Sequence, residues 1–80
     1  MKPGDIFRRK DVSLEKYNNC SDCKQGFSFK IKLLKLDQLL SDLYDDNCWQ
    51  IKSITPKRDA APITEKMINA YYEKLDIVAD

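Results

Sequence analysis

The sequence predicts an α+β fold: a small three-stranded, largely antiparallel sheet with a short central helix and a C-terminal helix, stapled by a zinc knuckle. Three observations predict this fold. Apolar and polar residues alternate over 27–33, apolar residues then recur at helical spacing, and two segments each carry a pair of potential metal ligands. At 80 residues the chain is expected to form a single domain, residues 1–80. A domain of this size buries only about 60–65% of its unfolded surface, so a metal cross-link would help to stabilise it.

The alternating segment gives the clearest strand. Over 27–33 every second residue is apolar, which is the period of a strand with one buried face. The residues expected to face the core are Phe27, Phe29, Ile31 and Leu33, and those expected to face water are Ser28, Lys30 and Lys32. A first strand is expected at 5–9, after the Pro3-Gly4 turn, and a third at 49–54, before Pro56. Residues 10–26 are expected to form an irregular loop and residues 56–62 a linker.

Two segments have helical periodicity. The first is predicted to be a helix of about two turns over 38–45, capped by Asp37. Its apolar residues recur at spacings of three and four: Leu36, Leu39, Leu40, Leu43 and Tyr44. The C-terminal helix is expected to have Pro62 near its first turn and Thr64 as a cap. Its repeating residues are Ile63, Met67, Tyr71 and Leu75, and we expect it to cover the sheet.

The candidate metal ligands come from two segments with the same spacing. Cys20 and Cys23 are three positions apart, and so are Asp45 and Cys48. Tetrahedral zinc accepts thiolate sulfur and carboxylate oxygen, and two such pairs can supply four ligands. The chain has no histidine, so a fourth protein ligand must be Asp or Glu. The prediction is therefore a zinc site formed by Cys20, Cys23, Asp45 and Cys48.

Several alternatives to this site remain open. Asp46, Asp22 or Asp42 could serve as the fourth ligand instead of Asp45. Cys48 could instead be a small buried residue beside Trp49, with the other two cysteines on a loop. A thiol redox pair is disfavoured, because such a motif normally lies at a helix N-terminus and here a glycine and a strand follow it.

The predicted zinc is structural. Three thiolates and a carboxylate would fill the coordination shell, whereas a hydrolytic zinc needs an open position. No histidine is available as a general base, and no nucleophilic triad or glycine-rich phosphate loop is present. We therefore expect the protein not to be an enzyme.

The charge pattern is uneven although the net charge is only +1. Residues 1–36 carry nine Lys or Arg against four Asp or Glu, and residues 37–56 carry one against four. A small net charge gives little general attraction to nucleic acid, so we do not expect direct nucleic-acid binding. The chain has no signal peptide or apolar run of membrane-spanning length, which predicts a cytoplasmic protein with reduced thiols.

Two features have a second interpretation that involves nucleic acid. The basic residues Arg8, Arg9, Lys10, Lys30, Lys32 and Lys35 could contact phosphates. Lysines alternating along a strand more often protect a sheet edge in solvent, which is the preferred interpretation. Phe27 and Phe29 could stack on bases, but their alternation with lysines favours a place in the core. An exposed ring of the Tyr71-Tyr72 pair could contact a protein partner.

Size, composition and the pattern of Cys20, Cys23 and Cys48 resemble those of small phage- or prophage-encoded anti-CRISPR proteins, in particular the zinc-binding inhibitors of Cas9. This resemblance implies a protein that binds a defence nuclease and obstructs guide or target DNA loading, with zinc holding its fold. It also implies a location in the host cytoplasm. The near-neutral charge differs from that of highly acidic inhibitors that imitate DNA, and favours binding to a specific protein surface.

Two other classes of function stay open. The first is a zinc-ribbon-like nucleic-acid-binding or transcription accessory module that uses the basic first 36 residues. The second is a thiol redox protein with a reversible Cys20–Cys23 disulfide. The expected oligomeric state is a monomer or a homodimer formed by pairing or covering a sheet edge.

Overall fold

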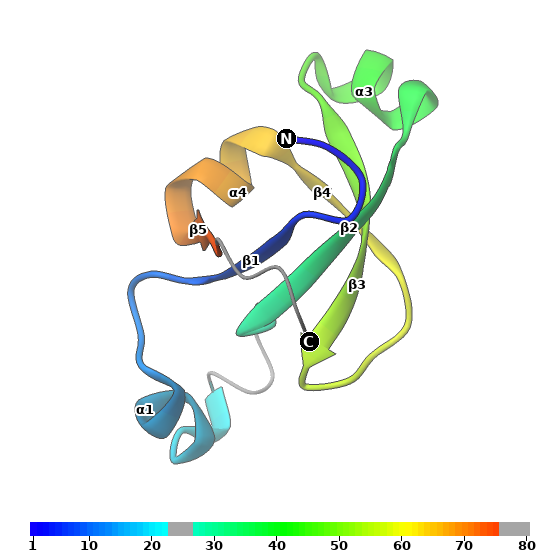
Figure 1. Cartoon of the computed structure of the whole chain (residues 1–80). Helices are drawn as coiled ribbons and strands as arrows, with labels where there is room; N and C mark the ends of the chain where they lie inside the picture. The colour runs from blue at the N-terminus through cyan, green and yellow to red at the C-terminus, as the bar shows by residue number, and fades with distance from the viewer. Residues whose placement is uncertain (23–26, 76–80) are drawn as a thin grey trace.

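The structure, a computed structural model, describes residues 1–22 and 27–75. It is α+β, as the sequence predicts (Figure 1). The strands are β1 (Ile6–Arg9), β2 (Lys30–Leu36), β3 (Cys48–Thr55), β4 (Ala61–Thr64) and β5 (Tyr72–Lys74), and the helices are α1 (Leu14–Asn18), α3 (Gln38–Tyr44) and α4 (Glu65–Tyr71). All strand pairs are antiparallel, in the order β4-β3-β2-β1-β5.

The sheet has five strands, so the prediction of three was too small. The first added strand, β4, lies in part of the segment expected to be a linker, and Pro62 sits within it. A proline lacks the N–H that a central strand must donate, but β4 is an edge strand and tolerates this loss. The second added strand, β5, was expected to be helical. Tyr72 instead leaves the helix and pairs with Arg9 of β1.

Strand β2 begins three residues later than predicted. Phe29, Ile31 and Leu33 are buried, as expected, whereas Phe27 is 41% exposed. Phe27 lies outside the strand, and its ring stacks on Tyr71 with the ring centroids 5.5 Å apart. The alternation predicted the buried face correctly over 29–33 but placed the strand too early in the chain. Ser28, which was expected to face water, is buried.

The core lies between the sheet and α4. Its buried cluster consists of Phe7, Ile31, Leu33, Trp49, Ile51, Ile68 and Tyr72, with Ile63 packed against it. Ile68 comes from α4, so the C-terminal helix covers one face of the sheet, as predicted. Thr64 caps this helix by accepting a hydrogen bond from the Met67 backbone N–H at 3.3 Å, also as predicted. Burial of each large apolar side chain contributes about 1.5–3 kcal/mol of transfer free energy.

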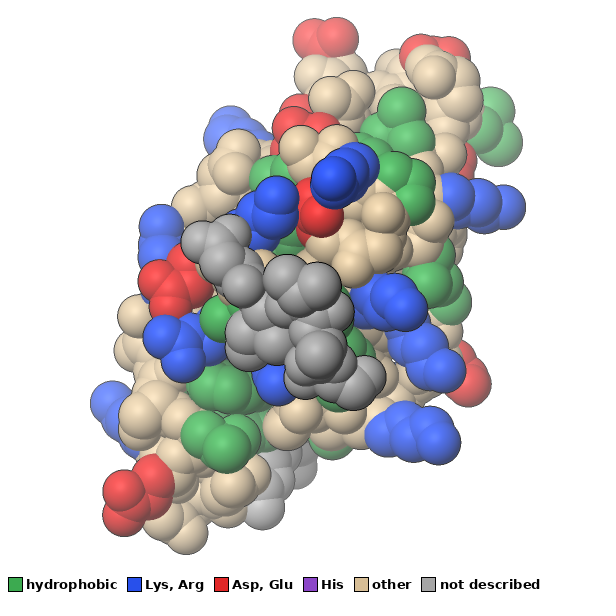
Figure 2. All heavy atoms as spheres, in the orientation of Figure 1, with side chains coloured by type: hydrophobic (Ala, Val, Ile, Leu, Met, Phe, Trp, Pro, Cys, Tyr) green, Lys and Arg blue, Asp and Glu red, His purple; other side chains and the backbone are tan. Residues whose placement is uncertain are grey.

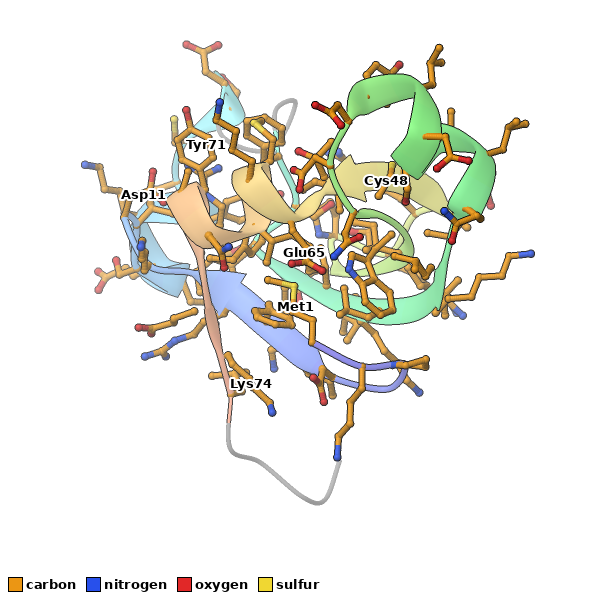
Figure 3. The ribbon with its side chains drawn as sticks, turned by 90° about the horizontal axis from the view of Figure 1, so that it is seen from above. Met1, Asp11, Cys48, Glu65, Tyr71 and Lys74 are labelled. Carbon is orange, nitrogen blue, oxygen red and sulfur yellow. The ribbon has the colours of Figure 1, made fainter. Side chains whose placement is uncertain are left out.

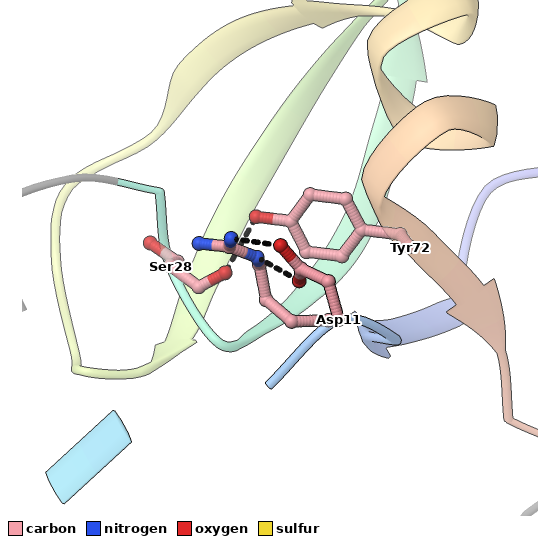
Figure 4. A network of polar contacts seen from close by, with 4 residues as sticks. Asp11, Ser28 and Tyr72 are labelled. Atoms are coloured by element: carbon pink, nitrogen blue, oxygen red, sulfur yellow. Dashed lines mark hydrogen bonds and ion pairs between the residues drawn. The ribbon is translucent and has the colours of Figure 1, made fainter. Parts of the chain in front are cut away.

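One end of the sheet carries α1, within a segment that was predicted to be irregular. Ser13 caps this helix by accepting a hydrogen bond from the Lys16 N–H. Tyr17 is buried, and its ring lies 5.6 Å from that of Phe29. Nearby, the Tyr72 hydroxyl donates a hydrogen bond to the Ser28 carbonyl (Figure 4).

The opposite end of the sheet carries α3 and the start of α4. The Glu65 carboxylate accepts hydrogen bonds from the Trp49 indole N–H at 2.9 Å and from the Asn47 side-chain amide at 3.0 Å. The Lys66 backbone N–H donates to the Asp46 carboxylate at 3.0 Å. Glu65 therefore lies beside the segment that leads into β3, and these contacts hold the α3–β3 connection against α4 (Figure 3).

Candidate functional site

Helix α3 is held in place mainly by polar contacts. Asp37 caps its N-terminus, accepting a hydrogen bond from the Leu40 backbone N–H at 3.0 Å. The second carboxylate oxygen of Asp37 accepts one from the Gln50 side-chain amide at 2.8 Å. These two hydrogen bonds, the Leu40 bond first, lower the pKa of Asp37 below its ordinary value, so its carboxylate is charged at neutral pH. The predicted cap at Asp37 is confirmed.

The buried residue of this helix is Ser41, a polar residue. Its hydroxyl donates to the Asp37 carbonyl at 2.7 Å and accepts a hydrogen bond from the Cys48 backbone N–H at 2.8 Å. The Asp37 N–H in turn donates to the Cys48 carbonyl at 2.7 Å. The polar side of the helix therefore faces the start of β3, and much of its apolar side points away from the strand.

The apolar side of α3 faces solvent. Leu39 is 80% exposed, Leu43 is 71% exposed and Tyr44 is 60% exposed. An amphipathic helix of a small soluble protein normally turns such residues toward the core, and exposed apolar residues that adjoin one another often mark an interaction site. We call Leu39, Leu43 and Tyr44 the α3 apolar surface. In Figure 1 the helix stands away from the body of the sheet.

A shallow apolar hollow of about 230 Å³ adjoins this surface. Tyr44 belongs to both, so the apolar surface continues from α3 toward β4 and α4. The remaining residues that line the hollow are Phe27, Cys48, Pro62, Ile63, Thr64 and Met67. A partner that covers α3 could place a side chain in this hollow.

Acidic residues surround the same end of the molecule. Asp42 and Asp45 are exposed and Asp46 is partly exposed. All three line a second, more polar hollow of about 360 Å³ beside α3. Asp45 has a left-handed backbone conformation, with φ of +54°, and ends the helix through a hydrogen bond from its N–H to the Ser41 carbonyl. The surface thus combines an apolar centre with an acidic rim.

The four predicted zinc ligands are not brought together by the described part of the chain. Cys23 lies outside the described residues. Asp45 and Cys48 are near one another in sequence, but they line different hollows. Among residues 1–22 and 27–75, no group of three or more Cys, His, Asp or Glu side chains is arranged to hold a metal ion.

Cys20 and Cys48 lie at opposite ends of the sheet. The Cys20 backbone N–H donates a hydrogen bond to the carbonyl of Tyr17 in α1. The Tyr17 ring packs on the ring of Phe29, the residue directly before β2. That end of β2 pairs with Thr55, the last residue of β3, whereas Cys48 is its first residue. Eight strand residues span about 25 Å, so the two cysteines belong to segments that meet β3 near its two ends. Figure 3 likewise places Asp11, which precedes α1, and Cys48 at opposite ends. The zinc site stays a prediction.

Cys48 is buried beside Trp49, which matches the alternative role of a packing residue. Burial raises the pKa of its thiol, and the charges of Asp37 and Asp46 raise it further. The thiol is therefore protonated at neutral pH. Zinc binding and thiol exchange both require the thiolate, so Cys48 would have to lose this proton for either role.

The residues that form the α3 apolar surface were recognised in the sequence only as helix formers. Their spacing predicts a helix but not the side that is buried. The signal that could have identified the buried side was Ser41, a polar residue in the middle of the helix. Its hydroxyl can accept a hydrogen bond from the first backbone N–H of the strand that follows, at Cys48.

No helix in the described ranges is long and apolar enough to span a membrane. Comparison with known proteins gave no matching family model, no curated relative and no similar solved structure.

Proposed function

We propose that this protein is not an enzyme but a binding protein that inhibits a protein partner by docking through the α3 apolar surface. The observation that carries this proposal is the exposure of Leu39, Leu43 and Tyr44 on a helix fixed by polar contacts. Because the helix is already anchored, a partner can cover these side chains without first ordering the segment. Little conformational entropy is then lost on binding.

The acidic rim indicates the chemistry of the partner. Asp42, Asp45 and Asp46 around an apolar centre complement a basic surface with an apolar pocket. Nucleases that act on nucleic acid have such surfaces, and Cas9 holds its heteroduplex in a positively charged channel. Together with the resemblance to zinc-binding anti-CRISPR proteins, this makes Cas9 the partner proposed here. Docking on a protein surface beside this channel would obstruct guide or target DNA loading.

The test compares the wild type with the double variant Leu39→Ser/Leu43→Ser in Cas9 pull-down and DNA cleavage assays. Both leucines are exposed, so the substitutions should leave folding intact. Leu14→Ser is the matched control, because Leu14 is 48% exposed on α1 at the other end of the sheet. We expect the wild type and Leu14→Ser to bind and inhibit Cas9, and the double variant to lose both activities.

Two other results would direct the search elsewhere. A wild type that leaves Cas9 cleavage unchanged would remove Cas9 as the partner. A wild-type dimer that becomes a monomer in the double variant would show that a second copy of this chain covers α3.

A further inference from the structure

The sheet face turned away from the core is basic. Phe7, Ile31 and Ile51 point toward the core, so the residues that alternate with them point the other way. Strand register confirms the shared face, since Arg8 lies opposite Lys30 and Lys32 opposite Lys52. Lys35 joins this face opposite Gln50 because the register of β2 shifts between Leu33 and Lys35. We call the five cations of this face the basic sheet face: Arg8, Lys30, Lys32, Lys35 and Lys52. Figure 2 shows Lys and Arg side chains spread over the face of the molecule that it presents.

Few carboxylates neutralise this face. Arg8 forms an ion pair of 2.8 Å with Glu73, but among the described residues no ion pair is formed by the four lysines. Lys32 and Lys52 lie directly opposite each other on neighbouring strands. Like charges in this position repel and destabilise the sheet, so folding alone does not favour them. An anionic ligand would remove this repulsion.

The positive charge continues into an open hollow at one end of the face. This hollow, of about 560 Å³, lies between β1, the start of β2 and the segment that leads into α1. The cations in its lining are Arg8, Arg9, Lys10 and Lys30. Its acidic residues are Asp11, which pairs with Arg9 at 2.7 Å, and Glu73, which pairs with Arg8. Figure 4 shows the hydrogen bonds that the Asp11 carboxylate accepts.

The net charge of +1 gave no expectation of nucleic-acid binding, but the register gathers these cations on one face. We propose that the basic sheet face binds the phosphate backbone of duplex DNA, with the hollow at its end accommodating further phosphates. The binding residues differ from those of the α3 apolar surface, so this inference is independent of the proposed function. A duplex is favoured over a single strand because the aromatic rings of the strands, Phe7, Trp49 and Tyr72, are buried. Without exposed rings this face cannot stack on unpaired bases, and contacts to phosphates remain.

The number of cations sets the expected salt dependence. The logarithm of the affinity falls with the logarithm of salt concentration by about 0.9 for each phosphate neutralised. Five contacts therefore give a slope of about −4.5, and a rise from 50 to 200 mM salt weakens binding about 500-fold. Loss of two contacts changes the slope to about −2.7 and the loss of affinity to about 40-fold.

The experiment is a fluorescence anisotropy titration of a labelled 20-base-pair DNA duplex with the full chain at several salt concentrations. The test variant is Lys32→Gln/Lys52→Gln, which removes two charges at the centre of the face. The control is Lys66→Gln, because Lys66 is exposed on α4, which packs on the other face. Melting temperatures of all variants establish that each is folded.

We expect wild-type binding with the steep slope, unchanged binding by Lys66→Gln, and at least a tenfold loss with a flatter slope for the double variant. Absence of wild-type binding at 50 mM salt would overturn the proposal. An equal loss in Lys66→Gln would also overturn it, since the attraction would then be general. Tighter binding to a single strand would refute the duplex preference. Binding to poly-glutamate but not to DNA would assign the face to an acidic protein instead.

Discussion

Replacing Ser41 by alanine tests whether polar contacts fix α3. The hydroxyl of this buried residue joins the Asp37 carbonyl, at 2.7 Å, to the Cys48 backbone N–H, at 2.8 Å. Alanine has nearly the same volume, so little packing changes. The Cys48 N–H, however, loses this acceptor at a buried position. Loss of a partner by a buried donor costs about 1–3 kcal/mol.

For a domain of this size, each kcal/mol lowers the melting temperature by about 4–8 °C. A cost near the middle of that range, about 2 kcal/mol, predicts a melting temperature about 8–16 °C below that of the wild type. Thermal unfolding followed by circular dichroism at pH 7 measures this difference. Ser21→Ala is the control, because Ser21 is exposed. We expect it to melt with the wild type.

The same variant has a second consequence. If Ser41 anchors the helix, its loss should also weaken partner binding, even though Ser41 is buried and cannot touch a partner. A melting temperature for Ser41→Ala within about 2 °C of the wild type would refute the reasoning. The orientation of α3 would then depend on other contacts.

Three further predictions follow from single positions. Lys52→Glu places a negative charge directly opposite Lys32. We expect the free energy of unfolding in urea titrations to rise by a few tenths of a kcal/mol and DNA binding to weaken. A fall in both quantities would contradict the repulsion between Lys32 and Lys52. Burial, the largest cause, raises the pKa of Tyr72 to about 12, so the unfolded state loses this proton first and stability should fall as pH rises from about 10 to 12. Urea unfolding across this range should show a smaller fall in Tyr72→Phe, and an equal fall would contradict the assignment. Asp45→Gly should keep or raise the melting temperature, because its φ of +54° favours glycine, whereas a zinc ligand at this position predicts a decrease.

The predictions that depend on local sequence were mostly confirmed. The alternation around β2 identified Ile31 and Leu33 as core residues, and the caps at Asp37 and Thr64 are where they were expected. Capping depends on contacts within one turn, and alternation follows from the geometry of a single strand. Sequence is sufficient for features of this kind.

The two missed strands depend on pairing between distant segments. Tyr72 has helical spacing from Ile68, yet its backbone pairs with Arg9 and its side chain completes the core. Similarly, β4 pairs with β3 although Pro62 disfavours a strand. Both strands exist because neighbouring strands had unpaired edges, and local propensity does not report this.

The candidate site could be predicted only in part. The spacing of Leu39 and Leu43 predicts a helix, but the exposed side is decided by the hydrogen bonds of Ser41 to distant backbone groups. The metal ligands stay a prediction, because Cys23 lies outside the described residues and no group of three ligands is arranged within 1–22 and 27–75. Repeated spacing identifies candidate ligands, and only the fold decides whether they meet.

Native mass spectrometry tests the metal prediction separately. One zinc per chain, lost in both Cys20→Ser and Cys48→Ser, would confirm the predicted zinc site. A metal-free wild type that remains folded would refute it.

The most direct test of the proposed function is Cas9 cleavage of target DNA in the presence of purified wild type, Leu39→Ser/Leu43→Ser and Leu14→Ser. Docking through the α3 apolar surface predicts that the wild type and Leu14→Ser inhibit cleavage and that the double variant does not. Uninhibited cleavage with the wild type, or equal inhibition by the double variant, would contradict it.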